Sequence, residues 1–468
     1  MHFGRIGIRL RSLERATRPE PPELKQALDR RWQEIPDAIR TPNQFLGRRV
    51  TGCEGTHGVF PRCNLACTPC YHSKDSNRVR TDGRHTAIEV DRQMRLAREI
   101  RGPGQAAQLI GGEVTLLGPD AHAEALETMI KWGRKPMSMT HGDFDYEYLE
   151  ALALDPATGE PRFRHLSFAG HFDMTMHGRR GIRKVRSEAE LNPFRERFCE
   201  MFARLEREHG VTSFLAHNMT VTPGNVDQIP ELIRACRSMG FQMFSFQPAA
   251  FVGSSARWKE AYRDTTDEYI WERIQEGTGG RLHPGAIQWG DPRCNRTAYG
   301  GFTGKRYWTL FRQDDPRDMR MRDRFLRAVG GTDFTVGRGL LAAKLFRGAL
   351  REPRILLSTM PFLFRLAARM GGILRMLRQR PVPVTFVMHN FMDAAVVKPA
   401  WEAMEKGEVS EEPAVQAAQE RLQGCMYGMA HPEQGRMVPA CVQHSVLDPQ
   451  ENIALAKHLP LAPRSSDA

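Results

Sequence analysis

The chain has 468 residues, a formal net charge of +12 and a hydrophobic content of 41%. These values exclude wholesale disorder and are typical of two or three folded domains, or of one large domain with appendages. Nine cysteines are too few for a disulfide scaffold, and the positive charge favours either an anionic partner or a well-solvated basic surface.

Residues 1–45 are charged and contain several prolines, a pattern that predicts a peripheral helix or arm. The first residues, MHFGRIGIRLRSLERATRPEPPELK, lack the apolar stretch of a secretory signal. No uncharged run of the chain approaches the roughly 18 residues that span a bilayer. We therefore expect a cytoplasmic protein with reduced thiols, in which clustered cysteines bind metal more often than they form disulfides.

Three cysteines fall close together in the segment CNLACTPCYH, namely Cys63, Cys67 and Cys70. Thiolates are good ligands for zinc and for iron–sulfur clusters. Structural zinc usually takes four ligands in two separated pairs, and no second pair follows here. His72 is too near Cys70 in the sequence to complete such a site. Three cysteines on a four-iron cluster would leave one iron open, as catalysis or substrate binding requires.

Between residues 46 and 280, short apolar runs alternate with amphipathic stretches. The candidate strands are residues 107–110, 137–140, 165–168, 214–216 with 219–221, and 242–246. Helical patterns separate them, which predicts right-handed βαβ units and a full or partial α/β barrel. Catalytic groups of such barrels lie at the carboxyl ends of the strands.

The stretch AQLIGGEVTLLG carries a predicted strand into Gly111, Gly112 and Glu113. Glycines at a strand end are common in ordinary turns, but they also let the backbone approach a ligand closely. The carboxylate of Glu113 would then supply the charge that holds an ammonium group. This GGE segment begins 41 residues after Cys70, which is one βα unit further along the chain.

Beyond residue 280 the character of the sequence changes. Residues 281–335 are rich in glycine and aromatic residues and predict an ordered loop region. Residues 336–382 predict basic amphipathic helices, with nine basic residues between positions 340 and 380 against one acid, Glu352. Such helices are typical of membrane interfaces, although helices packed on the barrel with a solvated basic side have the same pattern. No recognisable module predicts nucleic-acid binding.

The C-x3-C-x2-C spacing and the GGE segment together resemble the radical S-adenosylmethionine (SAM) superfamily, over about residues 50–250. The resemblance implies a partial (βα)6 barrel in which Cys63, Cys67 and Cys70 hold a [4Fe–4S] cluster. The fourth iron would chelate SAM, and an electron from the cluster would cleave SAM to a 5′-deoxyadenosyl radical. That radical would abstract hydrogen from an unactivated C–H bond of the substrate. A reductant such as flavodoxin or ferredoxin is the implied partner.

The resemblance also implies which residues bind SAM. Gly111, Gly112 and Glu113 would position its methionine end. The family prefers an aromatic residue just before the third cysteine, where this chain has Pro69, and Tyr71 stands just after that cysteine. The segment LSFAGHFDMTMHGRRG is similar to the family's ribose-facing segment, with Ser167 matching and Ala169 at the acidic position.

Residues 383–468 form a carboxyl-terminal segment with its own cysteine pair, Cys425 and Cys441. The pair resembles the opening half of the auxiliary-cluster hairpin of SPASM or twitch type. Cys294 or Cys53 would have to complete a second iron–sulfur cluster there. Packing without a cluster and zinc binding remain alternatives for these cysteines.

The sequence therefore predicts a radical SAM enzyme that is cytoplasmic or peripherally bound to an anionic membrane surface, where a lipid is the candidate substrate. One alternative is a peptide-modifying radical SAM enzyme that uses the carboxyl-terminal segment as its auxiliary-cluster domain. Another is a non-catalytic protein that binds zinc on its three cysteines and docks on membranes. The sequence assigns no residue a catalytic role beyond binding the cluster and SAM.

Overall fold

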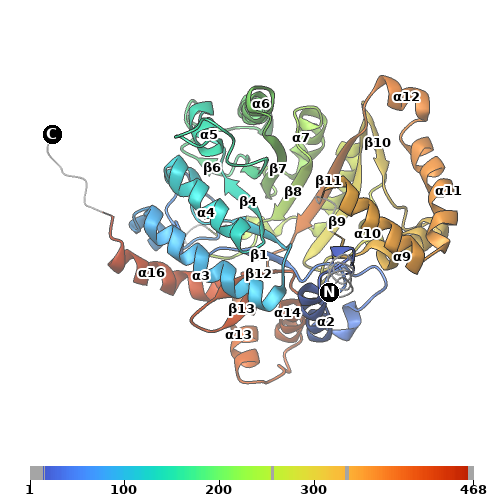
Figure 1. The fold of residues 1–468 in the computed structure, drawn as a ribbon. Coiled ribbons are helices and arrows are strands. Elements are labelled where there is room, and N and C mark those ends of the chain that lie inside the picture. Colours follow the sequence, from blue (N-terminus) through green and yellow to red (C-terminus); the bar gives the residue numbers. More distant parts are fainter. Residues whose placement is uncertain (1–13, 15, 254–257, 333–336, 462–468) are drawn as a thin grey trace, which may run out of the picture.

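The structure is a computed structural model, and it describes residue 14 and residues 16–253, 258–332 and 337–461. The protein has an α/β fold built around one eleven-stranded sheet, with helices packed around its outer face (Figure 1). The two edge strands of this sheet do not pair with each other in the described part of the chain. The sheet is therefore open and curled, not a closed barrel.

Six parallel strands follow one another in chain order through the middle of the sheet. They are β1 (Cys53–Gly55), β3 (Ala106–Leu109), β4 (Lys135–Thr140), β5 (His165–His171), β7 (Thr212–Val221) and β8 (Met243–Pro248). The helices that connect them are α3 (Gly83–Arg101), α4 (Pro119–Lys131), α5 (Tyr146–Ala153), α6 (Asn192–His209) and α7 (Ile229–Cys236). This is the alternation that the sequence predicts, and residues 214–221 form one continuous strand.

Two strands from the carboxyl-terminal segment extend the parallel run at both ends. β11 (Val382–His389) pairs with β8, and β12 (Tyr427–His431) pairs with β1. The parallel part of the sheet thus has eight strands, two more than the six expected of a (βα)6 barrel. Apolar side chains such as Phe386 and Met429 are buried in these two strands. They therefore belong to the central sheet and not to an appendage.

Antiparallel strands form both edges of the sheet. β9 (Asn295–Thr303) and β10 (Arg306–Thr309) make a hairpin against β11, and β13 (Arg436–Pro439) pairs with β12. Residues 281–335, expected to be an ordered loop, therefore contain a hairpin, followed by α9 (Pro316–Val329). Two of the glycines that suggested a loop, Gly300 and Gly301, lie inside β9. A Cβ atom on Gly301 would come within 2.2 Å of the Val382 carbonyl oxygen of β11.

The main apolar core lies between the sheet and the connecting helices. In α6 the buried side chains Phe198, Phe202 and Leu205 recur at steps of four and three residues, so one helix face meets the sheet. The ring of Phe202 lies 4.9 Å from that of Phe168 on β5, measured between ring centres. Asp82 accepts a hydrogen bond from the His85 backbone amide and so caps the start of α3.

The remaining helices lie elsewhere around the sheet, several of them on smaller apolar clusters. They are α2 (Pro22–Glu34), α8 (Asp267–Thr278), α10 (Arg338–Arg351), α11 (Arg354–Arg369), α12 (Ile373–Arg378), α13 (Ala394–Glu405), α14 (Pro413–Gln423), α15 (Ala440–Val442) and α16 (Asp448–His458). Helices α10 to α12 occupy the segment expected to be basic and amphipathic, whose predicted boundary at 335/336 lies outside the described residues. None of the described helices combines the length and the apolar composition needed to cross a membrane.

Strand β1, which leads into the cysteine segment, is anchored by a buried ion pair. Glu54 accepts hydrogen bonds of 2.8 and 3.0 Å from Arg134, which precedes β4, and both side chains are fully buried. We expect Glu54→Ala to lower the free energy of unfolding by about 3–5 kcal/mol, because it leaves the guanidinium buried without its carboxylate. Urea unfolding measures this loss.

The matched control is Asp29→Ala, which removes the exposed partner of Lys25 in α2. That change should cost less than about 1 kcal/mol. An equal loss in both variants would contradict the anchoring role of the buried pair.

Candidate active site

The three clustered cysteines lie on the segment of residues 60–72, which we call the cluster loop. It leaves the carboxyl end of β1 and contains β2 (Ala66–Cys67). β2 pairs in antiparallel fashion with β6 (Met176–His177), which follows β5. The Asn77 side chain accepts a hydrogen bond of 3.0 Å from the Cys63 amide, and the Cys63 sulfur accepts one of 3.4 Å from the Leu65 amide. The loop is therefore held at the carboxyl ends of the strands.

The GGE segment packs against the first limb of the cluster loop. The Gly112 amide donates to the Phe60 carbonyl at 2.7 Å, and the Glu113 amide donates to the Arg62 carbonyl at 2.9 Å. A Cβ atom on Gly112 would lie 2.0 Å from the Arg62 oxygen, and one on Gly111 would lie 2.7 Å from the Phe60 ring. The glycines thus permit a close backbone approach, and in this structure the approaching group is the cluster loop.

The second limb of the cluster loop is bound to the same segment. The Gly111 carbonyl accepts hydrogen bonds from the Tyr71 hydroxyl at 3.0 Å and from Nε2 of His72 at 2.5 Å. Nδ1 of His72 lies 3.2 Å from the Asp448 carboxylate of α16. Burial alone would lower the pKa of His72, but Asp448 outweighs this effect and the pKa is raised. Tyr71, which the resemblance assigns to SAM, therefore hydrogen-bonds the cluster loop to the GGE segment.

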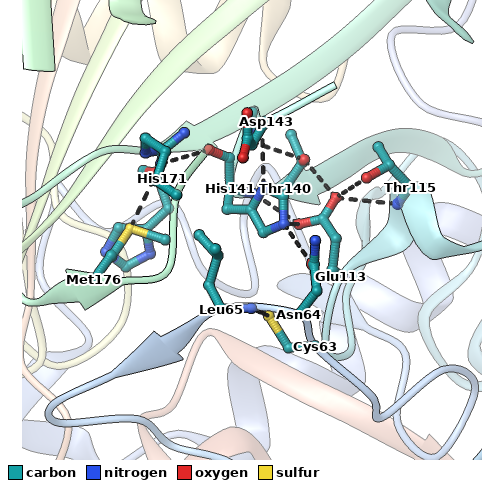
Figure 2. A network of polar contacts seen from close by, with 12 residues as sticks. Cys63, Asn64, Leu65, Glu113, Thr115, Thr140, His141, Asp143, His171 and Met176 are labelled. Carbon is teal, nitrogen blue, oxygen red and sulfur yellow. Dashed lines mark hydrogen bonds and ion pairs between the residues drawn. The ribbon is translucent and has the colours of Figure 1, made fainter. Parts of the chain in front are cut away.

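The Glu113 carboxylate is buried in a network of donors at the ends of β3 and β4 (Figure 2). One of its oxygens accepts from the Thr115 amide and hydroxyl and from the Thr140 hydroxyl, at 3.0, 2.6 and 2.7 Å. The other accepts from the His141 amide at 2.8 Å. Glu113 therefore holds His141 in place, and its contact with an ammonium group stays a prediction.

His141 connects this network back to the cluster loop. Its Nε2 atom lies 2.8 Å from the Asn64 side-chain oxygen, next to Cys63 (Figure 2). Burial lowers the pKa of His141, which favours the neutral ring. No sequence motif indicates His141, because a histidine after a strand is no signal by itself. Only the register of β3 and β4 shows that it faces the loop.

The Cys63 thiol is half-buried, and its surroundings favour the protonated form. Burial raises the pKa of its thiol to about 12, and the neighbouring Glu113 and Cys70 act in the same direction. Such a thiol ionises at neutral pH when a metal stabilises the thiolate. Among the described residues, the three loop sulfurs do not gather within 4.8 Å of one another, as they would around one tetrahedral zinc ion. A cubane, with separate irons, holds its cysteine sulfurs farther apart.

A second polar group lies at the carboxyl ends of β5 and β7. Asp173 accepts from the Thr220 amide at 2.8 Å and lies 2.6 Å from Nε2 of the partly exposed His171. The Thr175 amide and hydroxyl donate to the other Asp173 oxygen. Arg179 donates to the carbonyls of His171 and His141, which joins this group to the first. The H-x-D spacing shortly after the predicted strand of residues 165–168 is the signal that could have found it.

Ser167, which the resemblance assigns to the SAM ribose, has different surroundings. Ser167 lies four residues before the end of β5, where its hydroxyl is 3.3 Å from Nε2 of His165. The structure therefore does not bring it to Glu113 and the cluster loop. Its assignment to the SAM ribose stays a prediction.

The cysteines proposed for an auxiliary site come from separate segments around β12. The Arg421 guanidinium donates to Cys294 at 3.2 Å, and the Cys425 thiol donates to the Tyr427 carbonyl at 3.0 Å. Burial raises the pKa of Cys294 to about 11. Cys441 is buried in an apolar cluster at the start of α15, and both other thiols act on its pKa, so the three are neighbours.

No protein-family model and no curated protein matches this chain. Some solved structures share part of its fold. SuiB of Streptococcus suis bound to S-adenosylmethionine is 17% identical with a TM-score of 0.32, over 48% of this chain and 46% of SuiB. The protein anSMEcpe with bound AdoMet is 13% identical with a TM-score of 0.33, over 51% of this chain and 63% of anSMEcpe. The chain thus matches less than two thirds of either protein, and the likeness is partial and concerns the fold alone.

The close approach at Gly112 gives a direct test of how the cluster loop is positioned. Gly112→Ala places a methyl group against the Arg62 carbonyl, so the loop must move. We expect the free energy of unfolding to fall by about 1–3 kcal/mol and the iron bound after anaerobic reconstitution to decrease. Gly118→Ala is the control, since a Cβ atom there meets nothing within 4 Å. Unchanged iron binding in Gly112→Ala would contradict the positioning role.

The Asp173 network predicts a pH dependence of stability. Burial acts to raise the pKa of Asp173, but His171 and the other donors lower it from 3.8 to about 2. A lowered pKa in the folded state stabilises the protein above about pH 4, and this contribution is lost as the pH falls toward 2. Between pH 5 and pH 3 the stability difference between wild type and Asp173→Asn should shrink by about 1 kcal/mol. Stability profiles of the two proteins that stay parallel over this pH range would contradict the prediction.

Proposed function

We propose that this protein is a radical SAM enzyme whose [4Fe–4S] cluster is bound by Cys63, Cys67 and Cys70. The observation that carries the proposal is the position of the cluster loop. It leaves the carboxyl end of β1 and is clamped between the GGE segment after β3 and the β6 strand after β5. Catalytic sites of α/β barrels lie at this end of the strands.

The donor set fits such a cluster. Three soft thiols stand on one short loop, and a bound metal would lower the raised pKa of the half-buried Cys63. When bound, the cluster and SAM would supply the one-electron chemistry that removes hydrogen from an unactivated C–H bond, while the protein orients the reactants.

The chain's own residues would position these groups. The Gly111 carbonyl holds both Tyr71 and His72, and so fixes the part of the loop next to Cys70. Glu113 orients His141 toward Asn64 on the same loop. The GGE residues would then set where the methionine end of SAM meets the cluster, through the loop as well as through direct contact.

His171 lies at the carboxyl end of β5, the same end of the sheet as the cluster loop. Its ring is partly exposed, and the buried Asp173 carboxylate fixes one ring nitrogen at 2.6 Å. A histidine oriented in this way can hold or move a proton. We propose this positioning role for the pair, whatever the substrate. The net charge of +12 favours an acidic one-electron donor such as flavodoxin or ferredoxin as the reductant.

Iron and sulfide analysis after anaerobic reconstitution tests the proposal. The wild-type protein should turn brown and bind about four irons per cluster, and the triple variant of Cys63, Cys67 and Cys70 to Ala should lose them. About four irons retained by that variant would mean a second cluster at Cys294, Cys425 and Cys441. Complete loss would leave packing or zinc binding as the role of those three cysteines.

The reduced wild-type protein should also release 5′-deoxyadenosine from SAM, and the triple variant should not. A wild-type protein that binds zinc in place of iron and leaves SAM intact would refute the enzyme and support the binding-protein alternative. Assays with deuterium-labelled lipids and peptides test which of the two is the substrate, because only the substrate loses or gains hydrogen in the reaction.

A further inference from the structure

Large apolar side chains are exposed mainly in one region of the described chain. Of eighteen such residues, twelve lie between positions 345 and 382. Figure 1 shows α11 and α12 on the outer side of the molecule, beyond the β9–β10 hairpin. Single exposed apolar side chains are ordinary, but a group on consecutive helices is typical of a binding surface.

Helix α11 has two faces with different surroundings. Its inner face packs on the protein through buried Phe362, whose ring centre lies 5.3 Å from that of Phe311. Arg365 and Arg369 form ion pairs with the buried Asp318 of α9, so these two arginines attach the helix to the protein. The outer face exposes Leu356, Leu357, Met360, Leu363 and Phe364.

Helix α12 continues this exposed apolar face. It has no buried residue, so no face of it packs on the protein as the inner face of α11 does. Ile373, Leu374 and Leu377 are 64%, 73% and 79% exposed. Arg375, Arg378 and Arg380 are exposed beside them and form no ion pair with another described residue. We call the exposed apolar residues of α11 and α12 the apolar outer face.

We propose that the apolar outer face docks on a lipid bilayer that contains anionic lipids. The leucines and phenylalanine would enter the boundary between headgroups and acyl chains, and the arginines after residue 374 would bind the headgroups. The helices would lie on the bilayer, because none of the described helices is able to cross it. This inference goes beyond the proposed radical chemistry and does not depend on it.

The charges favour a membrane over a second copy of the chain. The single acid between residues 340 and 380, Glu352, already pairs with Arg327 at 3.2 Å. A symmetric dimer through the outer face would bring the same arginines of both copies together. Anionic lipids would instead neutralise the arginines while their acyl chains accept the leucines.

The docking surface and the candidate active site lie at opposite ends of β11. Helix α12 leads into the first residue of that strand, Val382. The cluster loop lies at the carboxyl ends of the parallel strands. Docking would therefore hold the enzyme at the membrane without by itself placing a lipid at the site.

Vesicle co-sedimentation of the reconstituted full-length protein tests this docking. We expect binding to vesicles of phosphatidylcholine with equal phosphatidylglycerol, and none to phosphatidylcholine alone. The triple variant Leu357→Ser, Leu374→Ser and Leu377→Ser should bind at least about a hundredfold more weakly, since each leucine loses its apolar contact. The matched control changes exposed apolar residues elsewhere to Ser, at Ile88, Val409 and Ile453.

The charge is tested separately with Arg375→Gln, Arg378→Gln and Arg380→Gln. Removing about 1 kcal/mol of attraction for each arginine should weaken binding about a hundredfold. The control changes three exposed basic residues in another part of the sequence to Gln, namely Arg183, Lys184 and Arg186. It should bind like the wild type.

Three results would overturn the proposal. One is a wild-type protein that ignores the anionic vesicles. Another is equally weakened vesicle binding in the control variants, which would mean that binding depends on charge or hydrophobicity anywhere on the protein. The third is a wild-type protein that is a dimer in light scattering and does not bind vesicles, while the leucine variant is a monomer. Iron content and 5′-deoxyadenosine release should be the same in all of these variants, so failure of docking is distinguishable from failure of the enzymatic proposal.

Discussion

The architecture of the candidate site depends on one close backbone contact. The amides of Gly112 and Glu113 donate to the carbonyls of Phe60 and Arg62, across a distance that leaves no room for a Cβ atom at Gly112. This contact joins the ends of β1 and β3 and sets where the three cysteines stand relative to the sheet. Two adjacent parallel strands thus act as a rigid base for a loop that has little regular structure of its own.

The last part of the chain completes this arrangement from the other side. β12 pairs with β1, and α16 brings Asp448 to His72 beside the third cysteine. Residues more than 370 positions apart therefore share one site. Such a site forms only when the carboxyl-terminal strands join the sheet, which ties the geometry of the cluster loop to the folding of the whole protein.

The positive charge is divided between structural and exposed arginines. Arg365 and Arg369 neutralise a buried aspartate, and Arg134 does the same for Glu54 in the core. Arg375 and Arg378 remain exposed beside leucines. Net charge alone therefore overstates the cationic surface. Arg375 and Arg378 precede β11 and so lie toward its amino end, opposite to the end with the proposed chemistry.

The sequence by itself determined the local features: the three-cysteine loop, the GGE turn, and the alternating strands and helices, because each is encoded by near neighbours along the chain. Only the tertiary structure decided that β11 and β12 join the parallel sheet and that Gly300 and Gly301 lie in a strand. It also decided that Glu113 faces His141 and that Asp448 faces His72. These contacts depend on strand register and on long-range packing, which residue spacing does not encode.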